Sequence, residues 1–254
     1  MSLDERLPSR AAPAPRPLTV PADFDRALSA RTSVKRPSPS RSVSGALPRA
    51  YVDALIQSGF VIKGKDVQAY YTNLKNNRGI RYDQLIRKFV ETNPFGVTEL
   101  EAHVMFGYTT KLFYAKLNKA VRDGLPSAKC ELVRLLKSGT AKMPKANPRQ
   151  FRGLLNPSEE VRNRYRNAKP GDVVVFNGFS SSSDNPTAEF WDIADIRFTT
   201  DDSEARDVSA LSLPVQFPGK IPGLASDQES LFLLNAKFRV ESNDGRDLVM
   251  RQII

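Results

Sequence analysis

Two carboxylates spaced two positions apart, Asp227 and Glu229, are the residues of this sequence best placed to do chemistry. They precede residues 230–234, a small and apolar run that predicts a buried, rigid strand. Side chains alternate between the two faces of a sheet, so both carboxylates would point to the same face if the strand starts here. A carboxylate pair fixed on a rigid strand, beside a Pro- and Gly-rich loop at residues 213–226, is a suitable place for chemistry.

The single cysteine and single histidine limit the other chemistries open to the chain. Cys130 alone excludes an internal disulfide, and together with His103 it cannot complete a His/Cys zinc site. The same counts disfavour Ser-His-Asp and Cys-His catalysis, unless His103 acts as a single base. Both residues are expected to pack in helices, and no metal is implied.

The length and composition indicate one folded domain with a tail. The chain has 254 residues, of which 40% are hydrophobic, enough for a core. No uninterrupted apolar run reaches the roughly 18 residues that a membrane span needs, so no span is expected. Residues 1–6 lack the basic and apolar stretches of a Sec signal peptide.

The net charge of +10 admits nucleic acid, an anionic membrane or an acidic protein as a partner. Residues 1–50 carry nine Lys/Arg against four Asp/Glu, which is about half of the excess. The remaining basic residues are not clustered with stacking aromatic residues, as a nucleic-acid surface requires. A basic nucleic-acid-binding protein is therefore the less favoured alternative, and no nucleic-acid partner is expected.

The chain divides into a leader and one folded region. Residues 1–48 are rich in Pro, Ser, Ala and Arg, and such a segment buries too little apolar surface to offset its ordering entropy, so a disordered leader is expected. Residues 49–254 should form one domain. Apolar residues recur at helical spacing over residues 50–139, and strand patterns begin at Gln150. Helices followed by strands predict an α+β fold.

Local signals predict the individual elements. Thr98, with Glu101 three residues later, predicts a helix start with a capping box. This helix is expected to pause at Gly107 and restart over residues 108–121, and a helix over residues 127–136 should stop at Gly139. A short helix is expected over residues 157–168. The expected strands are residues 151–155, 173–176, 190–198, 208–211, 231–234, 237–241 and 248–254.

Four short segments follow one another along the chain: Gln150-Phe151-Arg152-Gly153, Gly178-Phe179-Ser180-Ser181-Ser182-Ser183, Ala205-Arg206-Asp207-Val208-Ser209-Ala210-Leu211-Ser212 and Asp227-Gln228-Glu229. Upstream, residues 107–122 hold Tyr108, Tyr114, Asn118 and Arg122. In order, spacing and strand context, this set resembles the Arg-Ser-Glu class of mono-ADP-ribosyltransferases, the family of many bacterial toxins and injected effectors. The resemblance covers about residues 100–254. It implies a helical lobe followed by two packed antiparallel sheets, with a cleft for NAD between the sheets.

The resemblance also implies roles for individual residues in using NAD as a substrate. Arg152 would hold the pyrophosphate, and Gly153 would let backbone groups reach the nicotinamide amide. Ser181 would orient Glu229, and Glu229 would be the catalytic carboxylate that stabilises positive charge on the ribose. The other residues that would lie at the NAD cleft are Phe179, Ser183, Tyr108 and Asn118.

The sequence departs from the family pattern at the acceptor position. Asp227 stands where the family's Glu-x-Glu motif has its first glutamate, the residue that binds and helps activate the acceptor arginine. Aspartate is one methylene shorter, so an acceptor guanidinium must approach more closely. Arginine remains the expected acceptor, on a protein substrate of a host. Phe217, in the loop before the motif, could dock that substrate.

One alternative is a degenerate transferase fold that binds an arginine-containing peptide through Glu229 without turning over NAD. In a related version, one of Arg26, Arg31 or Arg36 of the leader occupies the acceptor pocket.

The cysteine-poor chain with a Ser/Pro/Arg-rich start also resembles substrates of type III secretion. Secretion from a bacterium into the host cytoplasm is therefore expected. The protein is also expected to be a monomer.

Overall fold

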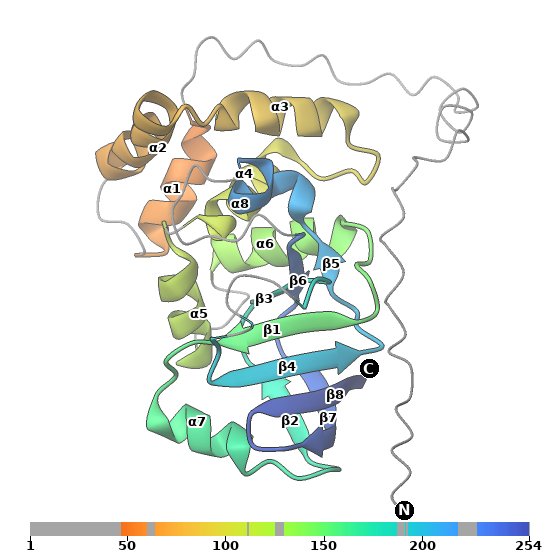
Figure 1. The fold of residues 1–254 in the computed structure, drawn as a ribbon. Helices are drawn as coiled ribbons and strands as arrows, with labels where there is room; N and C mark the ends of the chain where they lie inside the picture. Colours follow the sequence, from red (N-terminus) through yellow and green to blue (C-terminus); the bar gives the residue numbers. More distant parts are fainter. Residues whose placement is uncertain are drawn as a thin grey trace, which may run out of the picture. The chain divides into compact units, whose positions relative to one another are not determined.

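The computed structural model describes residues 47–59, 64–110, 112–124, 130–186, 191, 193–217 and 228–253. Within these ranges the chain forms helices first and two sheets afterwards, which confirms the predicted α+β class (Figure 1). The leader up to residue 46, the loop from residue 218 and Asp227 lie outside the described residues.

The helical part is built around a buried central helix, α4 (Glu99–Thr109), in which every residue from Glu101 to Tyr108 is buried. The surrounding helices are α1 (Arg49–Gln57), α2 (Gly64–Arg78), α3 (Tyr82–Thr92), α5 (Tyr114–Arg122) and α6 (Glu131–Lys142). None of the helices in the described part of the chain is both long and apolar enough to span a bilayer.

The predicted capping box at the start of α4 is confirmed. The Thr98 hydroxyl accepts from the Glu101 amide at 3.3 Å, and the Glu101 carboxylate accepts from the Thr98 amide at 2.8 Å. The two predicted glycine breaks are wrong, because α4 runs through Gly107 and α6 runs through Gly139. At both positions the neighbouring side chains occupy the space that a Cβ would need, so these glycines serve close packing instead of ending a helix.

The larger sheet has five strands in the order β1-β4-β8-β7-β2. Their bounds are β1 (Gln150–Leu154), β4 (Ile196–Asp201), β8 (Asp247–Ile253), β7 (Ala236–Asn243) and β2 (Val173–Phe176). The expectation of wholly antiparallel sheets needs one correction, because β4 and β8 pair in parallel. Helix α7 (Glu159–Arg166), near the predicted position, connects β1 to β2.

The smaller sheet is antiparallel, in the order β3-β6-β5, with β3 (Ser180–Ser182), β6 (Ser230–Phe232) and β5 (Arg206–Asp207). A strand was predicted over residues 208–211, but Ser209–Leu211 form a 3₁₀ turn, η3, followed by the short helix α8 (Leu213–Gln216). The strand predicted over residues 190–198 begins only at Ile196. There Ile196, Phe198 and Thr200 alternate into the core.

The smaller sheet lies between two hydrophobic cores, with the helices on one side and the five-stranded sheet on the other (Figure 1). Leu231 of β6 packs into the helical core, and its neighbour Phe232 packs into the core beneath the larger sheet. This strand is thus buried on both faces, as the apolar run after Glu229 predicted. Residues at its start are therefore held by packing from two sides.

Candidate functional site

Glu229 lies directly before β6, and its backbone is held on both sides. Its carbonyl oxygen accepts from the Val208 amide at 2.9 Å, and its amide donates to the Ser209 hydroxyl at 3.0 Å. Gln228, one residue earlier, donates to the Asp207 carboxylate at 3.1 Å. The segment after β5 thus fixes the chain that carries Glu229.

The Glu229 side chain is half-buried and accepts from two serine hydroxyls. Ser181 donates to Oε1 at 3.0 Å, and Ser212 donates to Oε2. The predicted partnership of Ser181 and Glu229 is therefore present as a contact across β3 and β6. Ser212 was quoted in the sequence motif but assigned no role, and its position in the chain carries no local signal of this contact.

Burial raises the pKa of the Glu229 carboxyl above its usual value, while the hydrogen bonds from Ser212 and Ser181 act in the opposite direction. The burial effect is the larger one, because removing an anion from water costs more than two neutral donors return. The site thus holds a poorly solvated carboxylate in a defined orientation.

Arg152 reaches the same place from β1. Its Nη1 donates to the carbonyl oxygen of Ser181, and the backbones of Phe151 and Ser183 exchange hydrogen bonds of 2.7 and 2.9 Å that join β1 to β3. Burial lowers the pKa of the Arg152 guanidinium, and the nearby positive charge of Arg122 acts in the same direction. An arginine nevertheless stays protonated, so a positive charge is held at Ser181, the residue that also contacts Glu229.

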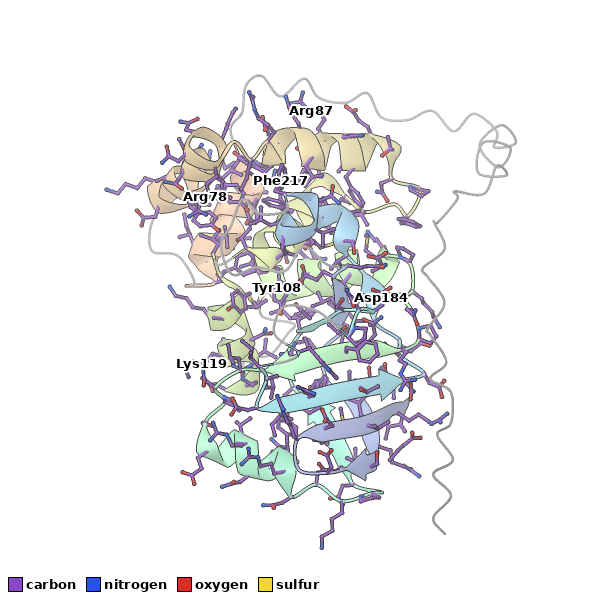
Figure 2. All side chains as sticks on the ribbon, in the orientation of Figure 1. Arg78, Arg87, Tyr108, Lys119, Asp184 and Phe217 are labelled. Atoms are coloured by element: carbon purple, nitrogen blue, oxygen red, sulfur yellow. The ribbon has the colours of Figure 1, made fainter. Side chains whose placement is uncertain are left out.

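Tyr108 and Phe179 contact each other where α4 meets the start of β3. The Tyr108 hydroxyl donates to the Phe179 carbonyl oxygen at 3.0 Å, and their rings meet edge to face at 5.8 Å between centroids. Asn118 of α5 donates to the Tyr108 hydroxyl at 2.8 Å and to the same carbonyl at 3.1 Å. Figure 2 shows Tyr108 between the helices and the strands. This network fixes the chain just before Ser181.

Comparison with known proteins gives matches in structure alone. No protein-family model matches the chain, and no curated protein sequence is similar to it. The ADP-ribosyltransferase HopU1 of Pseudomonas syringae pv. Tomato DC3000 superposes with a TM-score of 0.53 at 16% identity, covering 68% of this chain and 88% of that one. A truncated form of the type III effector XopAI from Xanthomonas axonopodis pv. citri superposes with a TM-score of 0.56 at 13% identity, covering 82% and 89%.

The chain has the ADP-ribosyltransferase fold. This confirms the fold that the four sequence segments implied. In this ADP-ribosyltransferase fold the motif residues Arg152, Ser181 and Glu229 come from both sheets and converge through the two contacts at Ser181.

The remaining predicted residues, Ser183, Gly153 and Phe217, differ in burial and in the residues that they contact or face. Ser183 is 8% exposed, and its hydroxyl accepts from the Asn185 amide at 3.1 Å. Gly153 lies in β1 opposite Arg197 of β4. Phe217 is half-buried and packs against the helical core, so much of its ring is already covered. Within the described ranges, no three His, Cys, Asp or Glu side chains are grouped as metal ligands.

Proposed function

We propose that this protein transfers ADP-ribose from NAD to a protein side chain, with arginine as the acceptor. The observation that carries the proposal is the convergence at Ser181, whose hydroxyl donates to Glu229 and whose carbonyl accepts from Arg152. A carboxylate and a guanidinium carried by different sheets are thereby both held through contacts to Ser181. NAD requires both, because it presents an anionic pyrophosphate and a ribose that becomes positively charged as nicotinamide leaves.

Arg152 suits the pyrophosphate because it has no competing anion nearby. Its one hydrogen bond is to a carbonyl, and no carboxylate of the described residues forms an ion pair with it. A guanidinium offers several planar donors that match phosphate oxygens. Arg122, whose charge also lowers the pKa of Arg152, is proposed to bind the second phosphate. The residue after Arg152 is Gly153, which has no side chain to keep the nicotinamide amide from the backbone.

Glu229 acts on the ribose. When the bond between nicotinamide and ribose breaks, its electron pair leaves with the nicotinamide and positive charge develops on the sugar. The Glu229 carboxylate, bonded to a ribose hydroxyl, stabilises that charge more in the transition state than in the ground state. Because Ser181 and Ser212 already hold the carboxylate, little reorganisation is needed when the charge develops.

Asp227 is proposed to receive the acceptor guanidinium, two residues before Glu229. The acceptor nitrogen attacks the ribose carbon, and its proton passes to this carboxylate or to water. An Asp227→Glu variant should modify the same acceptor residue, whereas Asp227→Ala should lose transfer to protein while keeping the release of nicotinamide. The acceptor residue is read by mass spectrometry of the labelled protein.

The protein is further proposed to act on a host target after secretion by a bacterium. The support is that two structures with this fold are an ADP-ribosyltransferase and a type III effector. A protein substrate also suits the proposed role of Asp227, because a protein can present an arginine side chain to this carboxylate. Expression in a eukaryotic cell and recovery of one labelled host protein would identify the target.

The decisive experiment incubates the purified full chain with labelled NAD and a eukaryotic lysate. Label should appear on a protein band, and it should be lost in Glu229→Gln but kept in Glu159→Gln, a matched change on the exposed start of α7. If the wild-type chain neither labels protein nor binds NAD by calorimetry, the transferase proposal is wrong. Binding of arginine peptides under those conditions would then favour the degenerate fold.

A further inference from the structure

We propose that Ser212 is a positioning residue that anchors the inward oxygen of Glu229 and leaves the other oxygen to meet the substrate. This inference rests on the proposed function and assigns the two oxygens of its carboxylate different tasks. It differs from the expectation drawn from the sequence, in which Ser181 alone orients Glu229.

The two serines that contact Glu229 differ in their exposure. Ser212, which donates to Oε2, is 0% exposed. Ser181, which donates to Oε1, is half-buried on β3. Oε2 therefore contacts a fully buried partner, whereas Oε1 contacts a partner that is partly exposed. A ribose hydroxyl arriving from solvent would meet Oε1, which can accept a second hydrogen bond beside that from Ser181.

Ser212 is itself held by the core. It lies between η3 and α8, and its neighbours Leu211 and Leu213 are both fully buried in the helical core. The Ser212 carbonyl accepts from the Gln216 amide at 2.9 Å, and the Leu213 amide donates to the Thr109 hydroxyl of α4 at 2.9 Å. The hydroxyl is thus presented by backbone that is tied to the central helix.

Two donors on different oxygens fix the rotation of a carboxylate, whereas one donor leaves it free to turn. Without Ser212, Oε2 would remain buried with no described donor, and burial already disfavours ionisation of this group. Fewer molecules would carry the anion at a given pH, and those that do would orient it less well. Both effects reduce charge stabilisation in the transition state without removing a contact to NAD.

The test compares Ser212→Ala with Ser230→Ala in the full chain. Ser230 is an equally buried serine one residue after Glu229, but its hydroxyl has no hydrogen-bond partner among the described residues. Carbon-13 NMR of labelled glutamate carboxyls, assigned with Glu229→Gln, should show a higher pKa for Glu229 in Ser212→Ala and no change in Ser230→Ala. Ser212→Cys, which keeps the size but donates weakly, should change the pKa in the same direction.

In the transferase assay, Ser212→Ala should lower kcat about tenfold or more, as expected for a hydrogen bond to a charged group, with KM for NAD unchanged. The acidic limb of the pH–rate profile of Ser212→Ala should move to higher pH. If Ser212→Ala and Ser212→Cys fold but titrate and react as the wild type does, Ser212 has no positioning role. A wild-type chain without transfer would instead overturn the proposed function, and the NMR titration would still decide whether Ser212 anchors the carboxylate.

Discussion

The hydroxyl of Tyr108 in α4 donates a hydrogen bond of 3.0 Å to the carbonyl oxygen of Phe179, 71 residues later in the chain. This contact joins the most buried helix to the residue that precedes β3, and β3 carries Ser181. The geometry of the carboxylate site therefore depends on the helical part, although none of its predicted catalytic residues lies there.

Replacing Tyr108 with Phe should weaken both stability and activity. The change removes a buried hydroxyl and leaves Asn118 with one acceptor fewer, which should cost about 1–3 kcal/mol of unfolding free energy. KM for NAD should rise as β3 loosens. Urea unfolding and initial rates test this, with Tyr114→Phe as the control, since Tyr114 is 43% exposed. Equal effects from the two variants would show that the Tyr108 hydroxyl has no special role.

Replacing Gly107 with Ala should destabilise the helical core severely. A Cβ there would lie 2.2 Å from the Tyr51 hydroxyl oxygen and 2.9 Å from a ring carbon of Phe113. Such overpacking costs about 3 kcal/mol or more. Tyr51→Phe removes the closest obstacle, at the loss of its 2.8 Å hydrogen bond to Tyr71. The double variant should be more stable than Gly107→Ala alone, and strictly additive unfolding free energies would contradict this account.

Glu101 should make the stability of the helical part sensitive to acid. Burial opposes its ionisation, but hydrogen bonds from Lys142, Ser138 and Thr98 together hold its pKa below the ordinary value of 4.5. Because the folded-state pKa is depressed, its contribution is present above pH 4.5 and is lost as the pH falls through the folded-state pKa.

Unfolding free energies of the wild type and Glu101→Gln should therefore differ at pH 7 and converge under acid. The difference at neutral pH should be about 1–3 kcal/mol, since the main partner, Lys142, is one-third exposed. Glu131→Gln is the control, because it removes an exposed carboxylate that pairs only within α6. A difference that persisted unchanged at pH 3 would show that the ionised form of Glu101 is not the stabilising one.

Glu229 should have the opposite effect on stability. Its folded-state pKa is raised, chiefly by burial, so its stabilising contribution is present at low pH and is lost as the pH rises through that pKa. Above that pKa the protein carries a poorly solvated anion, and there Glu229→Gln should raise Tm by a few degrees while abolishing transfer. The gain should vanish as the pH is lowered, which calorimetry at several pH values can follow. A lower Tm for Glu229→Gln above that pKa would contradict this reasoning.

The sequence correctly predicted those elements that neighbouring residues alone specify. The run Val173–Phe176 and the capping box at Thr98 were found where the sequence placed them. The predictions at the interior glycines were wrong because the side chains that require a glycine there belong to other segments. A Cβ on Gly139 would lie 2.9 Å from the sulfur of Met105 in α4, so this glycine lets two helices approach each other. No single-helix pattern contains that information.

The candidate site shows the same difference between features with local sequence signals and features that depend on distant segments. The serine at 181 and the glutamate at 229 could be paired from motif order, but β3 itself was missed because serines have no strong strand preference. Val208 and Leu211 fit a strand pattern, yet Val208 precedes η3 and Leu211 ends it, and both are buried because a spacing of three brings them to the same side of the turn. The same turn brings Ser212 back to Glu229, in the segment where β5 pairs with β6.

The position of β8 constrains how the molecule assembles. This strand is inserted between β4 and β7, so it pairs with partners both near and far in the chain. Until residues 247–253 are in place, no backbone hydrogen bond of the described residues joins β1 and β4 on one side to β7 and β2 on the other. The sheet must therefore close late and through contacts between distant segments, a topology associated with slow folding. A nascent or unfolded chain would expose unpaired edges of β4 and β7 during that interval, and such edges are prone to pair with other chains.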